Sequence, residues 1–217
     1  MTDHFFAVLE GLDGSGKSEI ARRLSDLLRA SLGANHVLQT YEPHNPSAAG
    51  EFCRDVLARR ITVSARTLAL AFALNRADHH ERVITPFMAA GAHRVVVCDR
   101  CTMSSLVYQS TGGQTIDDVW ELNKAALVPD LTLFLDADPD TCYARIGARQ
   151  GSDRELFEER LVETRAKYFT VIDLLRSRGQ QIAIIDANGT VEQVLDHAIA
   201  ALNQAAPAWM RLERIET

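Results

Sequence analysis

The chain has 217 residues, of which 47% are hydrophobic and 24% charged, and its formal net charge is −6. This composition supports one globular domain and excludes a chain dominated by disorder. Proteins that mainly bind nucleic acid polymers carry a basic excess, so the acidic balance argues against that class of partner. We therefore expect a single domain over residues 1–217.

Two further features bear on the compartment. The first residues lack the charged start and apolar core of a signal peptide, and no apolar stretch approaches the roughly 18 residues of a membrane span. Among four scattered cysteines, only Cys98 and Cys101 form a C-x-x-C pair, which is a weak sign of a zinc or redox site without a second ligand pair. We interpret all four as reduced thiols. These features predict a cytoplasmic protein with no membrane partner.

Short apolar segments alternate with helical segments, which is the pattern of parallel strands joined by crossover helices. Strands are predicted over residues 5–9, 37–40, 94–98, 131–135 and 181–185. Helices are predicted over residues 18–32 and over residues 66–90, the second with a bend near Pro86. The expected fold is a three-layer α/β/α domain with a parallel sheet of about five strands. Such sheets bind ligands beyond the carboxyl ends of their strands.

The strongest motif follows the first predicted strand. Residues 11–18 read G-L-D-G-S-G-K-S and match the P-loop pattern G-x-x-x-x-G-K-[ST] at every fixed position. In this motif, backbone N–H groups surround the phosphates, Lys17 reaches the β- and γ-phosphates of ATP, and the Ser18 hydroxyl binds Mg²⁺. A glycine-rich turn without a ligand is the alternative. The predicted ATP-binding residues here are Gly11, Asp13, Gly14, Ser15, Gly16, Lys17 and Ser18.

The residues next to this motif narrow the interpretation. Glu19 would repel a bound phosphate if it pointed inward, so we expect it to turn outward or to pair with an arginine. Guanine-specific GTPases usually carry N-K-x-D after a strand, whereas Asn123 and Lys124 have no aspartate two residues on and lie in a predicted helix. The sequence therefore argues against a GTPase.

Several other segments resemble the thymidylate kinase family in order and spacing. Residues 99–109 read D-R-C-T-M-S-S-L-V-Y-Q, close to the family pattern D-R-[YF]-x-x-S-S-x-A-Y-Q, with Cys101 in place of the aromatic residue. Phe72 and Arg76 followed by His79 or His80, the Glu42-Pro43 pair, and P-D-L-T-L-F-L-D at residues 129–136 also fit. The resemblance extends from about residue 5 to residue 202. It implies a homodimeric P-loop enzyme that uses ATP and Mg²⁺ to phosphorylate dTMP to dTDP.

The resemblance also implies how the acceptor nucleoside is bound. Phe72 would stack on the thymine ring, although a core phenylalanine is the alternative for this residue alone. Arg76, one turn later, would lie beside the acceptor. Ser105 and Gln109 would hydrogen-bond the base edge, and Tyr108 would crowd the 2′ position of the sugar and so favour deoxyribose.

Charged residues are expected around the acceptor phosphate and the metal. By the same resemblance, Arg54 and Arg100 would hold the 5′-phosphate through their guanidinium groups, and Asp13 would accept from the 3′-hydroxyl. Glu42 would lie near the acceptor phosphate and the metal. Asp99, at the end of the third strand, would contact metal-bound water or instead cap the following helix.

A basic segment at residues 145–154 resembles the arginine-bearing lid of the family, with the lid placed at about residues 145–155. Phosphoryl transfer depends mainly on alignment and on neutralising charge on the moving group. Because the P-loop itself has no arginine, Arg149 and Arg154 should supply the catalytic cation, while Arg145 should bind ATP. A solvated basic turn is the alternative. The predicted catalytic residues are Lys17, Arg149, Arg154, Asp13 and Arg100.

Three other functions stay open on the sequence. A related kinase could act on deoxyuridylate or on a modified deoxynucleotide. A nucleotide-binding regulatory pseudo-enzyme would keep the fold and lose turnover, but the intact Lys17, Ser18 and Asp99 argue against it. A P-loop ATPase acting on a macromolecule is disfavoured by the short chain and by the base-site motifs.

Overall fold

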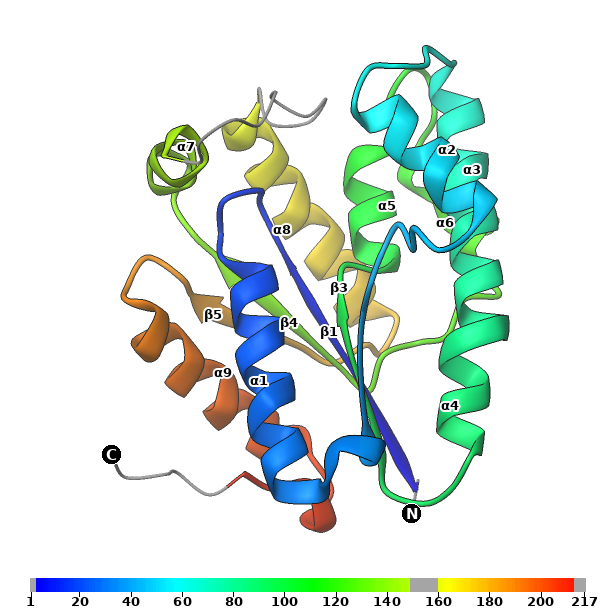
Figure 1. Cartoon of the computed structure of the whole chain (residues 1–217). Helices are drawn as coiled ribbons and strands as arrows, with labels where there is room; N and C mark the ends of the chain where they lie inside the picture. Colours follow the sequence, from blue (N-terminus) through cyan, green and yellow to red (C-terminus); the bar gives the residue numbers. More distant parts are fainter. Residues whose placement is uncertain (1–2, 149–159, 213–217) are drawn as a thin grey trace.

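The computed structural model describes residues 3–148 and 160–212, and within them all five predicted strands are confirmed. They form one parallel sheet in the order β2-β3-β1-β4-β5 (Figure 1). The strands are β1 (His4–Gly11), β2 (Val37–Tyr41), β3 (Arg94–Asp99), β4 (Leu131–Asp136) and β5 (Ile182–Asp186). Each observed strand extends one or two residues past its predicted carboxyl end, or is shifted by one residue.

Helices cover both faces of the sheet, which confirms the expected three layers. Figure 1 shows α1 and α9 in front of the sheet and α5 and α8 behind it, with α2, α3 and α4 beside the β2–β3 edge. The helices are α1 (Lys17–Leu32), α2 (Ala48–Leu57), α3 (Ala65–His79), α4 (Thr85–Ala89), α5 (Thr102–Tyr108), α6 (Ile116–Asn123), α7 (Pro139–Gly147), α8 (Leu161–Ser177) and α9 (Val191–Ala205). None of the helices within the described ranges is long and apolar enough to cross a membrane.

The predicted helix over residues 66–90 is divided near Pro86, as the sequence indicated. A π-helical turn at His80–Ile84 separates α3 from α4, and Pro86 lies in the first turn of α4, which begins at Thr85. Proline has no N–H to donate to the carbonyl of residue 82, and its ring would clash with that carbonyl in a regular helix. A wider π turn upstream absorbs this conflict.

Strand β1 is the central strand and is buried on both faces. Phe6 and Val8 pack in a cluster with Ile84, whereas Leu9 belongs to the larger cluster that extends to both helical layers. Burying side chains of this size contributes roughly 1.5–3 kcal/mol each. The one charged residue in the strand, Glu10, is also fully buried. The apolar run therefore explains the strand, but not the carboxylate within it.

The carboxyl ends of the parallel strands place the functional residues at one edge of the sheet. The P-loop follows β1, Glu42 follows β2, and Asp99 ends β3. The backbone N–H of Glu42 donates to the carbonyl of Asp99 at 3.0 Å and so links the ends of β2 and β3. Segments far apart in the sequence thus meet around the start of α1.

Candidate active site

The P-loop joins β1 to α1 and leaves the amino end of α1 open. Gly16 precedes the helix with a φ of 94°, and it supplies no side-chain cap to the first turn. The uncapped N–H groups and the helix dipole favour an anion at this end. Gly14 has a φ of 84°, and a Cβ on it would lie 2.6 Å from the carbonyl oxygen of Cys142. Both glycines are therefore required by the shape of the loop.

Lys17 lies inside the loop, with a side chain that is 6% exposed. Its Nζ donates to the carbonyl of Leu12 at 2.6 Å and lies 3.9 Å from Asp13 Oδ1. Burial, reinforced by the nearby Arg100, lowers the pKa of Lys17 to about 8. The ammonium group is thus poorly solvated, and phosphate oxygens would compensate that cost.

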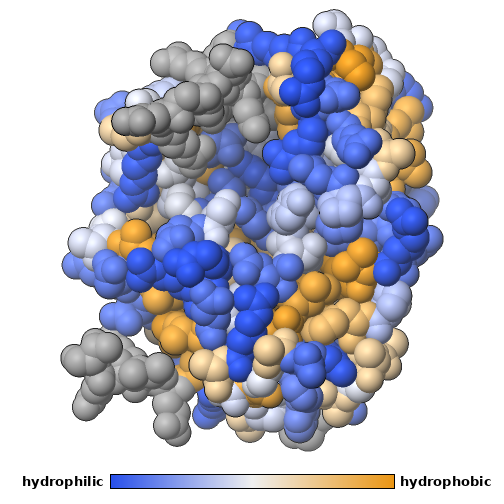
Figure 2. Space-filling model, viewed as in Figure 1, coloured by the Kyte–Doolittle hydropathy of each residue, from blue (hydrophilic) through white to orange (hydrophobic). Residues whose placement is uncertain are grey.

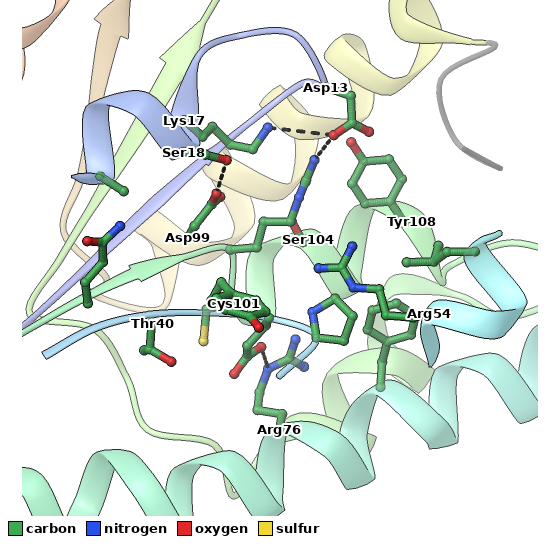
Figure 3. A pocket seen from close by; sticks show the side chains of 18 of the residues that line it. Asp13, Lys17, Ser18, Thr40, Arg54, Arg76, Asp99, Cys101, Ser104 and Tyr108 are labelled. Atoms are coloured by element: carbon green, nitrogen blue, oxygen red, sulfur yellow. Dashed lines mark hydrogen bonds and ion pairs between the residues drawn. The ribbon is translucent and has the colours of Figure 1, made fainter. Parts of the chain in front are cut away.

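Ser18 and Asp99 form a candidate Mg²⁺ site. The Ser18 hydroxyl donates to Oδ2 of Asp99, and both side chains face the phosphate loop (Figure 3). The second oxygen, Asp99 Oδ1, is buried and has no hydrogen-bond partner among the described residues. A hydroxyl beside an incompletely bonded carboxylate supplies the hard oxygen donors that Mg²⁺ prefers. The residues present therefore fit the ion.

Glu19 pairs with two arginines, which is one of the two expected arrangements. Its carboxylate accepts hydrogen bonds from Arg22 at 2.8 Å and from Arg23 at 2.7 Å. These hydrogen bonds lower the pKa of Glu19 to about 2. Glu19 still lines the cavity beside the P-loop, but two cations offset its negative charge there.

A cavity of about 790 Å³ opens beside the P-loop and continues toward α2 and α3. Figure 2 shows it as a hollow with a largely hydrophilic surface, and Figure 3 shows side chains entering it from several elements. Predicted site residues that line it are Asp13, Gly14, Gly16, Lys17, Ser18, Glu42, Arg54, Phe72, Arg76, Asp99, Arg100, Tyr108 and Gln109. The cavity thus brings the predicted ATP-binding and acceptor-binding residues together.

Arg100 connects the two halves of this cavity. Its NH2 group pairs with Asp13 of the P-loop, and its guanidinium lies 5.3 Å from the centre of the Tyr108 ring. The backbone at Arg100 has a φ of 71°, an unusual conformation for a residue other than glycine. Its side chain is only 17% exposed. The guanidinium therefore stands at the boundary between the P-loop and the predicted acceptor site.

A buried charged cluster forms the floor of the acceptor side. Arg76 Nε donates to Glu42 Oε2 at 2.7 Å, and the side chains are 2% and 3% exposed. His79 Nδ1 and His80 Nε2 lie 3.4 Å and 3.2 Å from the other oxygen, Glu42 Oε1. Burial raises the pKa of Glu42, but Arg76 and the two histidines lower it further, so the net pKa lies well below the usual range. Glu42 is thus an ionised partner of Arg76.

Glu42, His79 and His80 also resemble a set of metal ligands, since their donor atoms lie within 4.8 Å of one another. The hydrogen bonds argue against that use. The backbone N–H of Leu127 donates to His80 Nδ1 at 3.1 Å, so the ring proton of neutral His80 is on Nε2, the atom that faces Glu42. A metal on Nε2 would require the opposite tautomer. The predicted metal role of Glu42 is therefore not favoured by its surroundings, and it stays a prediction.

The remaining acceptor-site residues are distributed unevenly. Arg54 enters the cavity from α2, and its Nε donates to Asn45 Oδ1 at 2.9 Å (Figure 3). Gln109 is buried with an amide oxygen that has no partner in the described part of the chain, which suits a residue that binds a base edge. Ser105, in contrast, accepts from Arg76 NH1 at 3.0 Å, and the neighbouring Ser104 lines the cavity instead. The role predicted for Ser105 stays untested.

The predicted lid is only partly described. Arg145 lies on α7, and its NH1 donates to the carbonyl of Ala187 at 3.1 Å and lies 3.5 Å from the carbonyls of Gly14 and Ser15. It therefore ties the P-loop to the segment after β5. Arg149 and Arg154 lie outside the described residues, so their predicted catalytic roles stay predictions.

Several residues around the cavity escaped the sequence analysis. Glu10 and Tyr168 contact the Arg100 segment from β1 and α8, and Asn123 accepts from Arg76 at the end of α6. A charged residue inside an apolar strand was a usable signal for Glu10. Tyr168 and Asn123 lie in ordinary helical sequence, and nothing in their local pattern distinguishes them.

Comparison with known proteins agrees with this geometry. Residues 9–198 match the thymidylate kinase family. The chain is 39% identical to a thymidylate kinase of Ruegeria pomeroyi over 87% of this chain and 90% of that protein. It is 32% identical to a thymidylate kinase of Mesomycoplasma hyopneumoniae over 94% of this chain and 99% of that protein. In fold, it resembles the crystal structure of a thymidylate kinase from Ehrlichia chaffeensis, with a TM-score of 0.68 at 24% identity over 92% of this chain and 98% of that one. The chain belongs to the thymidylate kinase family.

Proposed function

We propose that this chain transfers the γ-phosphate of ATP to dTMP and so forms dTDP. The observation that carries the proposal is the single cavity that joins Lys17 and Ser18 of the P-loop to Phe72, Arg76 and Arg100 on the acceptor side. A phosphate donor bound at α1 and an acceptor bound against α3 would share this space. In-line phosphoryl transfer requires both substrates to be held together in that way.

The donor half stabilises the negative charge on the phosphates of ATP. The N–H groups at the start of α1 and the Lys17 ammonium group hold the β- and γ-phosphates, and the dry surroundings of Lys17 strengthen this attraction. Ser18 and Asp99 would hold Mg²⁺, which would offset negative charge on the phosphates of ATP. The sequence predicts that Arg149 and Arg154 add a further cation for the transferred phosphate.

The acceptor half holds the monophosphate in line with ATP. Phe72 offers an aromatic face to the base, and Gln109 offers its unbonded amide oxygen to a base N–H. Arg54 and Arg100 both line the cavity, and their guanidinium groups would bind the 5′-phosphate. Arg76 is held rigidly by Glu42 and Asn123 at the bottom of the cavity. This preorganisation limits the entropy lost on alignment.

The test is an acceptor panel with purified protein, Mg²⁺ and ATP, in which diphosphate and ADP are separated by chromatography. We expect dTMP to be the best acceptor, with dUMP and TMP clearly poorer, and the Lys17→Ala variant to form no product. Preference for another monophosphate would replace the acceptor in the proposal. Release of ADP at an equal rate without acceptor would refute the kinase assignment.

We further propose that the enzyme is a cytoplasmic homodimer. The four cysteines are reduced and buried, which suits a reducing compartment. On α3, Leu70 and Leu74 lie one turn apart and are 46% and 63% exposed, so they offer an apolar strip to a second copy. Light scattering should give twice the mass of the chain, and Leu74→Glu should give a monomer. A monomeric wild type would refute the dimer.

A further inference from the structure

Glu10 is a buried carboxylate that the mechanism above does not use. It lies in β1, directly before the P-loop, and is 0% exposed. Its Oε1 accepts from the backbone N–H groups of Cys101 at 2.8 Å and Ser104 at 3.0 Å. Its Oε2 accepts from Ser104 Oγ at 2.6 Å and from the Tyr168 hydroxyl at 3.3 Å. Two donors therefore point at each carboxylate oxygen.

The contacts at Glu10 suit an ionised carboxylate, which only accepts hydrogen bonds and has room for about four donors. Burial raises the pKa of Glu10 above its usual value, although the charge of Arg100 and the hydrogen bonds partly offset that effect. Oε1 faces two backbone N–H groups, which can only donate. Oε2 faces two hydroxyl groups, which can also accept and therefore take their direction from the group that they meet. An amide N–H in place of Oε2 would turn these hydroxyls around.

The hydroxyl groups of Ser104 and Tyr168 connect Glu10 to Arg100. Arg100 NH1 donates to Ser104 Oγ at 2.9 Å and to the Tyr168 hydroxyl at 3.1 Å. The Ser104 proton points to Glu10, and the Tyr168 proton points to Glu10 or to the carbonyl of Gly11 at 3.2 Å. With the Ser104 proton on Glu10, a lone pair of Ser104 Oγ can accept from the guanidinium. The two hydroxyl oxygens lie 3.2 Å apart, so Glu10 orients Ser104 directly and orients Tyr168 when the Tyr168 proton points to Glu10. The NH2 group is directed at Asp13.

The backbone around Arg100 depends on the same carboxylate. The left-handed conformation at Arg100 is strained for a residue with a Cβ. The Arg100 N–H donates to the carbonyl of Leu9 at 2.9 Å, and the next N–H, of Cys101, donates to Glu10. These consecutive bonds to β1 hold the strained turn in place.

We propose that Glu10 is a positioning residue for the acceptor phosphate, which acts by fixing Arg100 through Ser104, Tyr168 and the start of α5. The inference rests on the proposed function, because Arg100 is the group that would contact the acceptor. It assigns a role to a side chain that lies behind the cavity wall and touches no substrate itself.

The first test compares Glu10→Gln and Tyr168→Phe with the wild type, using whichever monophosphate the wild type phosphorylates best. We expect KM for the acceptor to rise at least tenfold and kcat to fall about tenfold, while KM for ATP changes less than threefold. The matched control is Asp130→Asn, because Asp130 accepts from the Phe6 N–H at 2.7 Å near the other end of β1. The control should leave every constant within twofold. Equal losses for both substrates in Glu10→Gln and Tyr168→Phe would overturn the proposal.

A double-mutant cycle separates positioning from general stability. If Glu10 acts through Arg100, adding Glu10→Gln to an Arg100→Lys enzyme should reduce kcat/KM by less than threefold further. A fully multiplicative loss would overturn the inference. If Glu10→Gln does not fold, Tyr168→Phe carries the same cycle, because it keeps the ring and removes only the hydroxyl.

A structural readout keeps this test independent of the acceptor. In a crystal structure of Tyr168→Phe, the Arg100 guanidinium should leave its place beside Asp13, and an unmoved guanidinium would refute the inference. A wild type that prefers an acceptor other than dTMP would refute the proposed function, yet the Arg100 comparison would still be made with that acceptor. The two failures are therefore distinguishable.

Discussion

The donor and acceptor halves of the cavity are built in different ways. The donor half is local: residues 11–18 supply the loop, the helix start, the lysine and the metal-binding hydroxyl within one strand-to-helix connection. The acceptor half takes single side chains from β2, α2, α3 and the β3–α5 connection and joins them through buried ion pairs. The first half is held mainly by backbone geometry, and the second by side-chain charge.

This difference predicts different sensitivities. Substitutions other than to proline leave the backbone N–H groups in place, so the donor half should depend strongly on Lys17 and weakly on its neighbours. In the acceptor half each buried charge is partnered by another, so removal of one leaves the other uncompensated. Damage there should appear in stability as well as in activity.

The largest expected effect is on catalysis in the donor half. Lys17→Ala should lower kcat by about a thousandfold or more, because a buried cation aimed at the transferred phosphate is lost. The unfolding free energy should change little or rise, since Lys17 is itself poorly solvated. Steady-state kinetics and urea unfolding measure both. Lys124→Ala, at an exposed lysine paired with Glu121, is the control and should retain full activity. A Lys17→Ala enzyme within tenfold of the wild type would contradict this prediction.

In the acceptor half, Glu42→Gln should mainly reduce stability, whereas Lys17→Ala mainly reduces activity. Loss of this carboxylate leaves Arg76 buried without its ion-pair partner and should reduce the unfolding free energy by about 3–5 kcal/mol. Urea unfolding followed by circular dichroism measures the change. Glu121→Gln removes one partner of an exposed pair and should cost less than about 1 kcal/mol. Similar losses for the two variants would show that the buried cluster is not special.

The pH dependence of the kinetic constants should report on Lys17 in the donor half. The pKa of Lys17 is lowered to about 8, so the cation is lost from the free enzyme as pH rises through that value. We expect kcat/KM for ATP to fall above pH 8, approaching tenfold per pH unit. Bound phosphates favour the charged lysine, so the falling limb of kcat should lie at higher pH. A profile of kcat/KM that is flat to pH 10 would contradict the assignment.

The smallest effect is expected at Glu19, whose carboxylate would repel a bound phosphate if it pointed into the P-loop. Because Arg22 and Arg23 offset the charge of its carboxylate, Glu19→Ala should change KM for ATP and kcat by less than threefold. Initial-rate kinetics at varied ATP would test this. An increase in activity of tenfold or more would mean that the charge does reach the phosphates and that the pseudo-enzyme hypothesis deserves renewed tests.

The amino-acid sequence by itself determined the strands, the P-loop and the family, because these depend on local patterns. Apolar runs such as residues 94–98 can form only buried strands in this context, and glycines at fixed spacing allow only a narrow loop that surrounds phosphate. The break near Pro86 was also predicted, but not its form, since a π turn just upstream relieves the steric conflict of the proline ring.

Only the tertiary structure decided how the charges of the site are partnered. The sequence did not show that Glu42 pairs with Arg76, and Glu10 and Tyr168 were not recognised as parts of the site. These contacts join residues 34, 87 and up to 158 positions apart in the chain. The cost of an unpartnered buried charge fixes such pairs strongly, but it acts only after the sheet has brought the strand ends together. No local sequence pattern indicates which distant residue will pair with a given buried charge.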